Sequence, residues 1–122
     1  MRVHLVAGCL FAFLGVAAGA FGTHALRERI STEMLDIWEI GVRYQIYHSL
    51  SLLLIGFLGE KTGLPAAWWA GVALMVGILL FSGSLYLLAW TGLRWLGAVT
   101  PLGGVAFLVG WLLLAWVVWS AK

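Results

Sequence analysis

The chain has 122 residues, of which 63% are hydrophobic and only 10% are charged, and its mean hydropathy is +1.04. A soluble domain of this size leaves too much surface in water to hide so many apolar side chains. The composition therefore excludes an ordinary soluble domain and predicts a protein whose solvent is lipid. The net charge of +2 comes from lysines and arginines spread over termini and loops rather than gathered in a stripe, so nucleic acid is not an expected partner.

Four apolar segments are long enough to cross a bilayer, which takes about 20 mostly apolar residues in a helix. We predict an all-α, integral membrane four-helix bundle, with residues 1–122 as a single membrane domain. The spans are expected at residues 3–25, 41–59, 66–90 and 95–119. The second span is the least apolar, because polar side chains occupy its first turns. The last two connections are short, so neighbouring spans run antiparallel and both termini lie on one side.

Residues 31–40, between the first two spans, are expected to form a short amphipathic helix. It either lies at the membrane interface or extends the second span outward. Ser31 is a typical helix-start residue, and acidic side chains recur on one side of the segment. Glu39 stands four residues before Arg43, a spacing at which the two side chains can pair on a helix.

Small residues recur along the spans and predict close packing of helices. In lipid the hydrophobic effect does not drive helices together, so their association depends on close packing of the backbones. The positions are Gly8, Gly15, Gly19, Gly22, Gly77, Ser84, Gly103 and Gly110. Packing within the chain is one interpretation, and contact between copies in a homo-oligomer is the other. Ser82, in the middle of the third span, is expected to bond back to its own helix, and Pro101 marks either a kink or the true start of the fourth helix.

Polar side chains gather where the second span begins, in the leaflet that also holds the end of the first span and the start of the fourth. This candidate polar cluster consists of His24, Arg43, Gln45, Tyr47, His48 and Thr100. Ionisable groups at membrane depth are costly and usually face other protein rather than lipid. The cluster is therefore the candidate site.

Three hypotheses remain open for the use of this cluster. The first is a non-enzymatic structural or accessory protein in membrane homeostasis, in contact with membrane lipids or a membrane-protein partner. The second is a binding or transport module for a lipid, a quinone or an anionic small molecule. The third is haem or metal binding through His24 and His48. No catalytic residues, metal ligands or cofactor are predicted, because the spans hold no carboxylate and no nucleophile paired with a base.

Four motifs, in order, resemble those of the domain-of-unknown-function-423 family of small bacterial inner-membrane proteins. They are GAFGTHAL at residues 19–26, RYQIYH at 43–48, GILLFSGSLY at 77–86 and LGAVTPLGG at 96–104. The eukaryotic transmembrane protein 256 group is similar as well. The resemblance implies a four-span protein of the bacterial inner (plasma) membrane and no established activity. It also implies that the polar cluster, together with Ser82, Ser84 and Pro101, belongs to family motifs.

Overall fold

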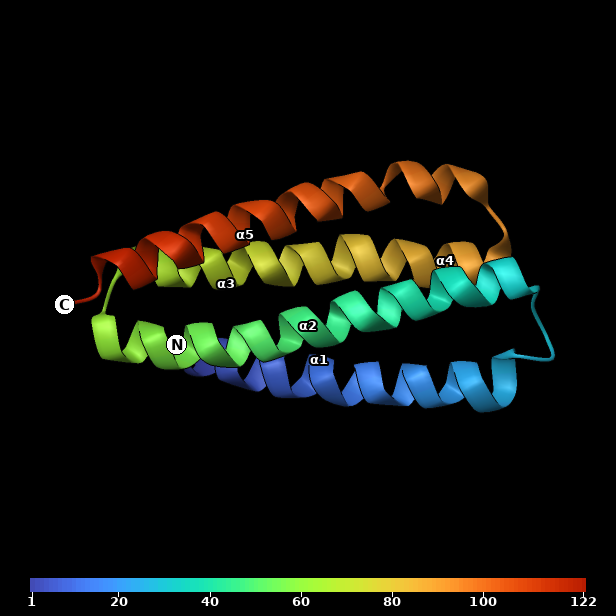
Figure 1. Cartoon of the computed structure of the whole chain (residues 1–122), viewed down its shortest axis with the longest axis horizontal. Helices are drawn as coiled ribbons and strands as arrows, with labels where there is room; N and C mark the ends of the chain where they lie inside the picture. Colours follow the sequence, from blue (N-terminus) through green and yellow to red (C-terminus); the bar gives the residue numbers. More distant parts are fainter.

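The computed structural model describes residues 1–122, and all of its regular structure is helical. Four helical rods run side by side in alternating directions, and both termini lie at the same end (Figure 1). We call this the terminal end and the opposite one the loop end. The first rod is α1 (Arg2–Phe21), which continues without a break through the π-helical turn η1 (Gly22–Leu26). The second rod is the single long helix α2 (Thr32–Thr62).

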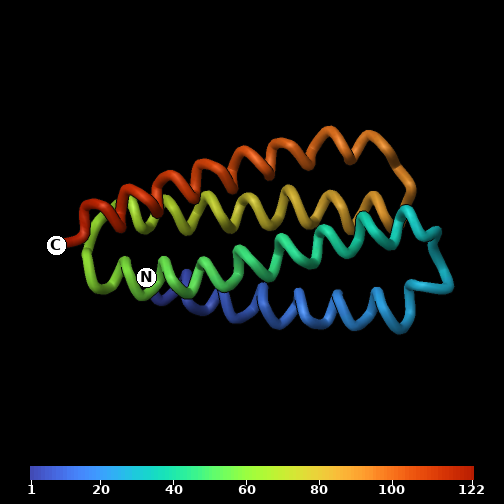
Figure 2. The backbone as a smooth tube through the Cα atoms, in the orientation of Figure 1, coloured from blue at the N-terminus to red at the C-terminus, as the bar shows by residue number.

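The third rod combines three elements in one continuous helix: α3 (Pro65–Gly77), the π-helical turn η2 (Ile78–Ser82) and α4 (Gly83–Thr91). The fourth rod begins with the 3-10 turn η3 (Arg94–Ala98) and continues as α5 (Thr100–Ser120). Figure 2 shows that the three connections between rods are short, so each rod returns beside the one before it.

Local chemistry sets the rod ends. Ser31 begins α2, and its side-chain oxygen accepts a hydrogen bond of 3.2 Å from the backbone N–H of Met34. Gly63 and Gly92 end α2 and α4 in the left-handed conformation, with φ of 65° and 73°, which glycine adopts without steric penalty. Pro65 and Pro101 stand in the first turns of α3 and α5, where a missing N–H leaves no bond unmade.

The segment 31–40 was expected either to lie at the interface as a short helix or to extend the second span outward, and the structure shows the extension. Residues 32–40 form the first turns of α2. With 31 residues, α2 is about 46 Å long at 1.5 Å per residue, whereas the hydrocarbon core is about 30 Å thick. The acidic side chains Glu33 and Asp36 in these turns are exposed. The segment holds no glycine or proline that would end a helix after the Ser31 cap, so the helix continues.

Three of the rods, at Arg2–Leu26, Pro65–Thr91 and Arg94–Ser120, are long and apolar enough to cross a membrane. The rod α2 is not among them, since its polar residues lower its mean hydropathy. It nevertheless lies at the centre of the fold, where it packs against α1 on one side and the third rod on another, while α5 packs against the third rod. The largest core cluster joins α2, the third rod and α5; its fully buried members include Leu52, Ile55 and Leu74.

Candidate functional site

The predicted polar cluster is divided between two opposite faces of α2. Gln45 and His48 are buried, whereas Arg43 and Tyr47 are exposed on the outer face. A helix turns by about 100° per residue, so positions 43 and 47 share one face while 45 and 48 point across the axis from them. His24 is exposed near the end of the first rod. The structure therefore does not assemble these side chains into one site.

Gln45 joins three rods. Its Nε2 donates a hydrogen bond of 2.8 Å to the backbone oxygen of Phe11 in α1. Its Oε1 accepts one of 2.6 Å from the hydroxyl of Tyr86 in α4. Both ends of the amide are thus used between helices, and the residue is only 4% exposed. Tyr86 did not stand out in the sequence, because it is one phenol inside an apolar span.

His48 joins α2 to α5. Its Nδ1 lies 2.6 Å from the backbone oxygen of Tyr44, and its Nε2 accepts a bond of 3.1 Å from the indole N–H of Trp111. A carbonyl only accepts and an indole only donates, so the ring is neutral, with its proton on Nδ1. Phe107 stacks on the ring at 3.6 Å between centroids. Because both nitrogens are engaged, haem or metal binding through His48 requires breaking one of these bonds.

The serines of the third rod also bond to other helices. Ser82 was expected to bond back to its own helix, but its hydroxyl donates a 2.7 Å bond to the backbone oxygen of Gly41 in α2. Gly41 has no side chain, and a Cβ there would press on Tyr86, so the rods approach closely enough for this bond. Ser84, predicted as a small packing residue, lies 2.6 Å from Thr100 of α5, hydroxyl to hydroxyl.

His4, which the sequence reasoning overlooked, is fully buried between the terminal ends of α1 and α3. Its Nε2 lies 3.0 Å from the backbone oxygen of Trp68, and a Cβ on Gly71 would overlap its ring. The only signal in the sequence was an isolated polar residue within an apolar run. Trp38 also joins two rods: its indole N–H donates a 2.9 Å bond to the backbone oxygen of Ala18 in α1.

The predicted glycines lie at interfaces within the chain. Those of the first rod face α2, where a Cβ would press on side chains of that helix; they are Gly8, Gly15, Gly19 and Gly22. The others lie between the third rod and α5; they are Gly77, Gly103 and Gly110. At Gly103 the obstacle is the backbone of Phe81, so no rotamer change relieves it. Further close contacts lie at Gly56 and Gly59 on α2, which face Leu5 and Met1.

The expected ion pair between Glu39 and Arg43 does not form. The one ion pair in the structure joins Arg94 and Glu33 at 3.9 Å, with both side chains largely exposed. Exposed pairs of this kind contribute little to stability. Arg43 therefore has no acidic partner within the protein.

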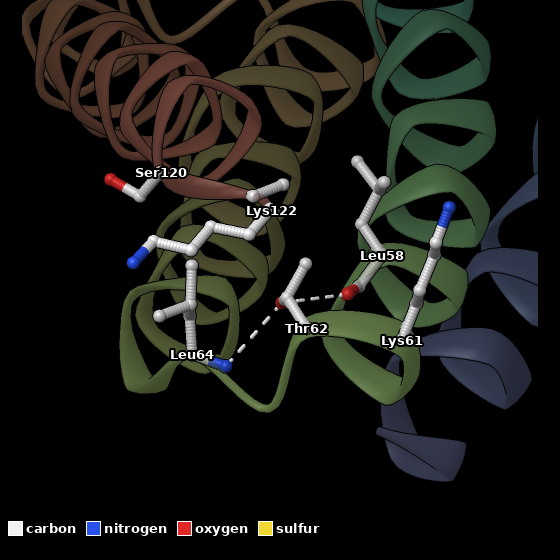
Figure 3. Close-up of a pocket in the computed structure, with 7 residues that line it drawn as sticks. Leu58, Lys61, Thr62, Leu64, Ser120 and Lys122 are labelled. Atoms are coloured by element: carbon white, nitrogen blue, oxygen red, sulfur yellow. Dashed lines mark hydrogen bonds between the residues drawn. The ribbon is translucent and has the colours of Figure 1, made fainter.

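A pocket of about 510 Å³ opens at the terminal end, beside the turn from α2 to α3 (Figure 3). Thr62 shapes this turn, since its hydroxyl donates to the oxygen of Leu58 at 2.8 Å and accepts from the N–H of Leu64 at 3.3 Å. Lys61 and Lys122 belong to the lining, but Figure 3 shows their side chains pointing in different directions. The two ammonium groups therefore do not converge on one anion.

Comparison with known proteins finds a family model and several relatives that resemble this chain. Residues 18–104 match the model of the family described as "Protein of unknown function (DUF423)". A UPF0382 membrane protein of Staphylococcus epidermidis is 48% identical over 89 residues, 73% of this chain and 72% of the relative. The UPF0382 membrane protein YwdK of Bacillus subtilis is 44% identical over 90 residues, 73% of each chain. No solved structure matches.

Proposed function

Since this chain belongs to the DUF423 family of small bacterial membrane proteins, we propose that it is a four-span protein of the bacterial inner membrane with a structural or accessory role. The chain contributes no chemistry of its own in this proposal. It supplies a rigid helical body whose lipid-facing surface supports the membrane or a neighbouring membrane protein. The three apolar rods support the membrane placement, and α2, packed among them, is the fourth span.

One observation carries the proposal: most of the buried polar side chains form hydrogen bonds from one rod to another. Gln45 bonds to α1 and α4, and His48 bonds to α5. Ser82 bonds to α2, and Ser84 pairs with Thr100 of α5. Each of these bonds joins two rods, and such interhelical bonds stabilise bundles in lipid. A catalytic or transport site instead needs polar groups that are free to meet a substrate.

The test distinguishes a structural role from a chemical one by expressing variants of the protein in a strain that lacks the gene. The double variant Ser84→Ala/Thr100→Val removes one polar pair without leaving either hydroxyl unpaired. A matched variant, His48→Phe, keeps a flat ring against Phe107 but has no nitrogen. The readouts are dye permeability of the membrane under osmotic stress and the amount of folded protein. A structural role predicts that each variant restores function in proportion to its folded amount. A variant that reaches the wild-type folded amount but restores nothing would show that the lost polar group acts chemically and would overturn the proposal.

A further inference from the structure

Arg43 is an exposed cation at membrane depth. Gly41, two residues before it, is bonded to Ser82 of the third rod. Ser82 lies nine residues from the end of α4 at Thr91, which is about 14 Å at 1.5 Å per residue. Arg43 is thus well inside the bundle end, yet its side chain is on the outer face. A charged side chain in this position is costly unless it reaches the interface or finds a counter-charge.

The surroundings of Arg43 offer no counter-charge from the protein. Its guanidinium takes part in no ion pair, and the one ion pair of the structure lies elsewhere. Glu39, one turn toward the loop end, is beyond ion-pair distance. Tyr47, one turn in the other direction, is 55% exposed. Helical side chains lean toward the helix N-terminus, so those of Arg43 and Tyr47 lean toward the headgroups at the loop end.

The outer face of α2 becomes apolar on the terminal side of these two residues. The exposed side chains at the following turns are the apolar Leu50, Leu54 and Phe57. Leu54 also borders an apolar groove of about 580 Å³ that it forms with Trp111 and neighbouring residues of α5. Leu54 lies 11 residues from Arg43, about 16 Å along the helix toward the terminal end. The outer face of α2 is therefore cationic and phenolic toward the loop end and apolar toward the terminal end.

We propose that Arg43 and Tyr47 bind the headgroup phosphate of an anionic phospholipid, which the two side chains reach by extending toward the loop end. Charge complementarity identifies the occupant: a guanidinium forms two parallel hydrogen bonds with a phosphodiester, and a lipid whose headgroup has no ammonium keeps its full negative charge for that pair. Tyr47 adds a hydroxyl donor. The proposal rests on the membrane placement made under the proposed function, and it names the lipid that this outer face selects.

The experiment measures lipid bound to the purified protein by native mass spectrometry in detergent. The probe is an equimolar mixture of phosphatidylglycerol and phosphatidylcholine with the same acyl chains. Wild-type protein is expected to retain phosphatidylglycerol preferentially. Arg43→Gln should lower that preference about tenfold, the effect of losing one charge-assisted contact. Arg43→Lys should lose less, since it keeps the charge but not the paired hydrogen bonds.

Two matched variants control for general charge. Arg29→Gln removes an exposed cation at the same end and should leave the preference unchanged. Glu39→Gln removes the nearest carboxylate on α2 and should preserve or strengthen binding. The inference is overturned if Arg43→Gln keeps the wild-type preference, if Arg29→Gln lowers it equally, or if inorganic phosphate alone displaces the lipid. Recovery of each variant from carbonate-washed membranes is measured first. Absence of the wild type from that fraction would count against the membrane placement instead.

Discussion

The hydrogen bond between Tyr86 and Gln45 offers the sharpest test of how the rods are held together. Tyr86→Phe keeps the ring, which packs on Trp38 at 4.6 Å, and removes only the hydroxyl that donates at 2.6 Å. It leaves Gln45 Oε1 without a donor in a residue that is 4% exposed. Interhelical bonds in membranes average about 0.6 kcal/mol with a maximum of about 1.7, and an orphaned buried acceptor adds to the loss. We expect Tyr86→Phe to lower the free energy of unfolding by about 1–1.5 kcal/mol.

The double variant tests whether this loss belongs to the pair. Gln45→Leu also breaks the bond to Phe11, so it should lower the free energy of unfolding by about 2 kcal/mol. In Gln45→Leu/Tyr86→Phe neither group is left unpaired, so the combined loss should fall short of the sum by about 1 kcal/mol. The assay is reversible unfolding in mixed micelles with increasing dodecyl sulfate, followed by circular dichroism.

The control is Tyr47→Phe, which removes an exposed phenolic hydroxyl and should change the free energy of unfolding by less than about 0.5 kcal/mol. Two results would refute the reasoning. In the first, the single losses add within about 0.3 kcal/mol, so the two side chains are not coupled. In the second, Tyr47→Phe is as destabilising as Tyr86→Phe, so removal of any phenol has the same effect.

Three further predictions concern packing and helix ends, all measured by the same unfolding assay. Gly103→Ala should destabilise by about 1–3 kcal/mol, because its Cβ would overlap the backbone of η2, whereas Gly104→Ala meets nothing within 4 Å and should be neutral or stabilising; equal effects would contradict this geometry. Gly63→Ala should lose about 1–2 kcal/mol from its positive φ alone, while Gly83→Ala, which also meets nothing within 4 Å but has a φ of −59°, should lose nothing. Ser31→Ala should lose about 1 kcal/mol by removing the α2 cap, and an unchanged midpoint would show that the cap is dispensable.

The rod ends were open to prediction from the chain because the rules that set them are local. The break before Pro65 and the turn at Gly92 depend on φ and on the missing N–H of proline, which neighbouring residues determine. The same rules identified Ser31 as a helix start. They left open whether the helix that begins there lies apart at the interface or continues into the second span, and in the structure it continues through residue 62.

The candidate site could be predicted only in part, since a list of polar residues does not say which of them point inward. The sequence drew attention to Arg43, Gln45, Tyr47 and His48, but the structure places two of them inside and two outside. The deciding partners come from elsewhere in the chain: Tyr86 stands 41 residues after Gln45, and Trp111 stands 63 residues after His48.

By itself, the sequence determined that the chain is helical and has the apolar composition of a membrane protein. Apolar runs and helix-ending residues are local features, so they can be recognised without knowing the fold. Only the tertiary structure decided which polar groups are satisfied and which are left free. That outcome depends on the rotation of α2 about its own axis, which is set by close contacts such as those at Gly15 and Gly41. The rotation turned Gln45 and His48 toward neighbouring helices and left Arg43 exposed on the outer face without an acidic partner.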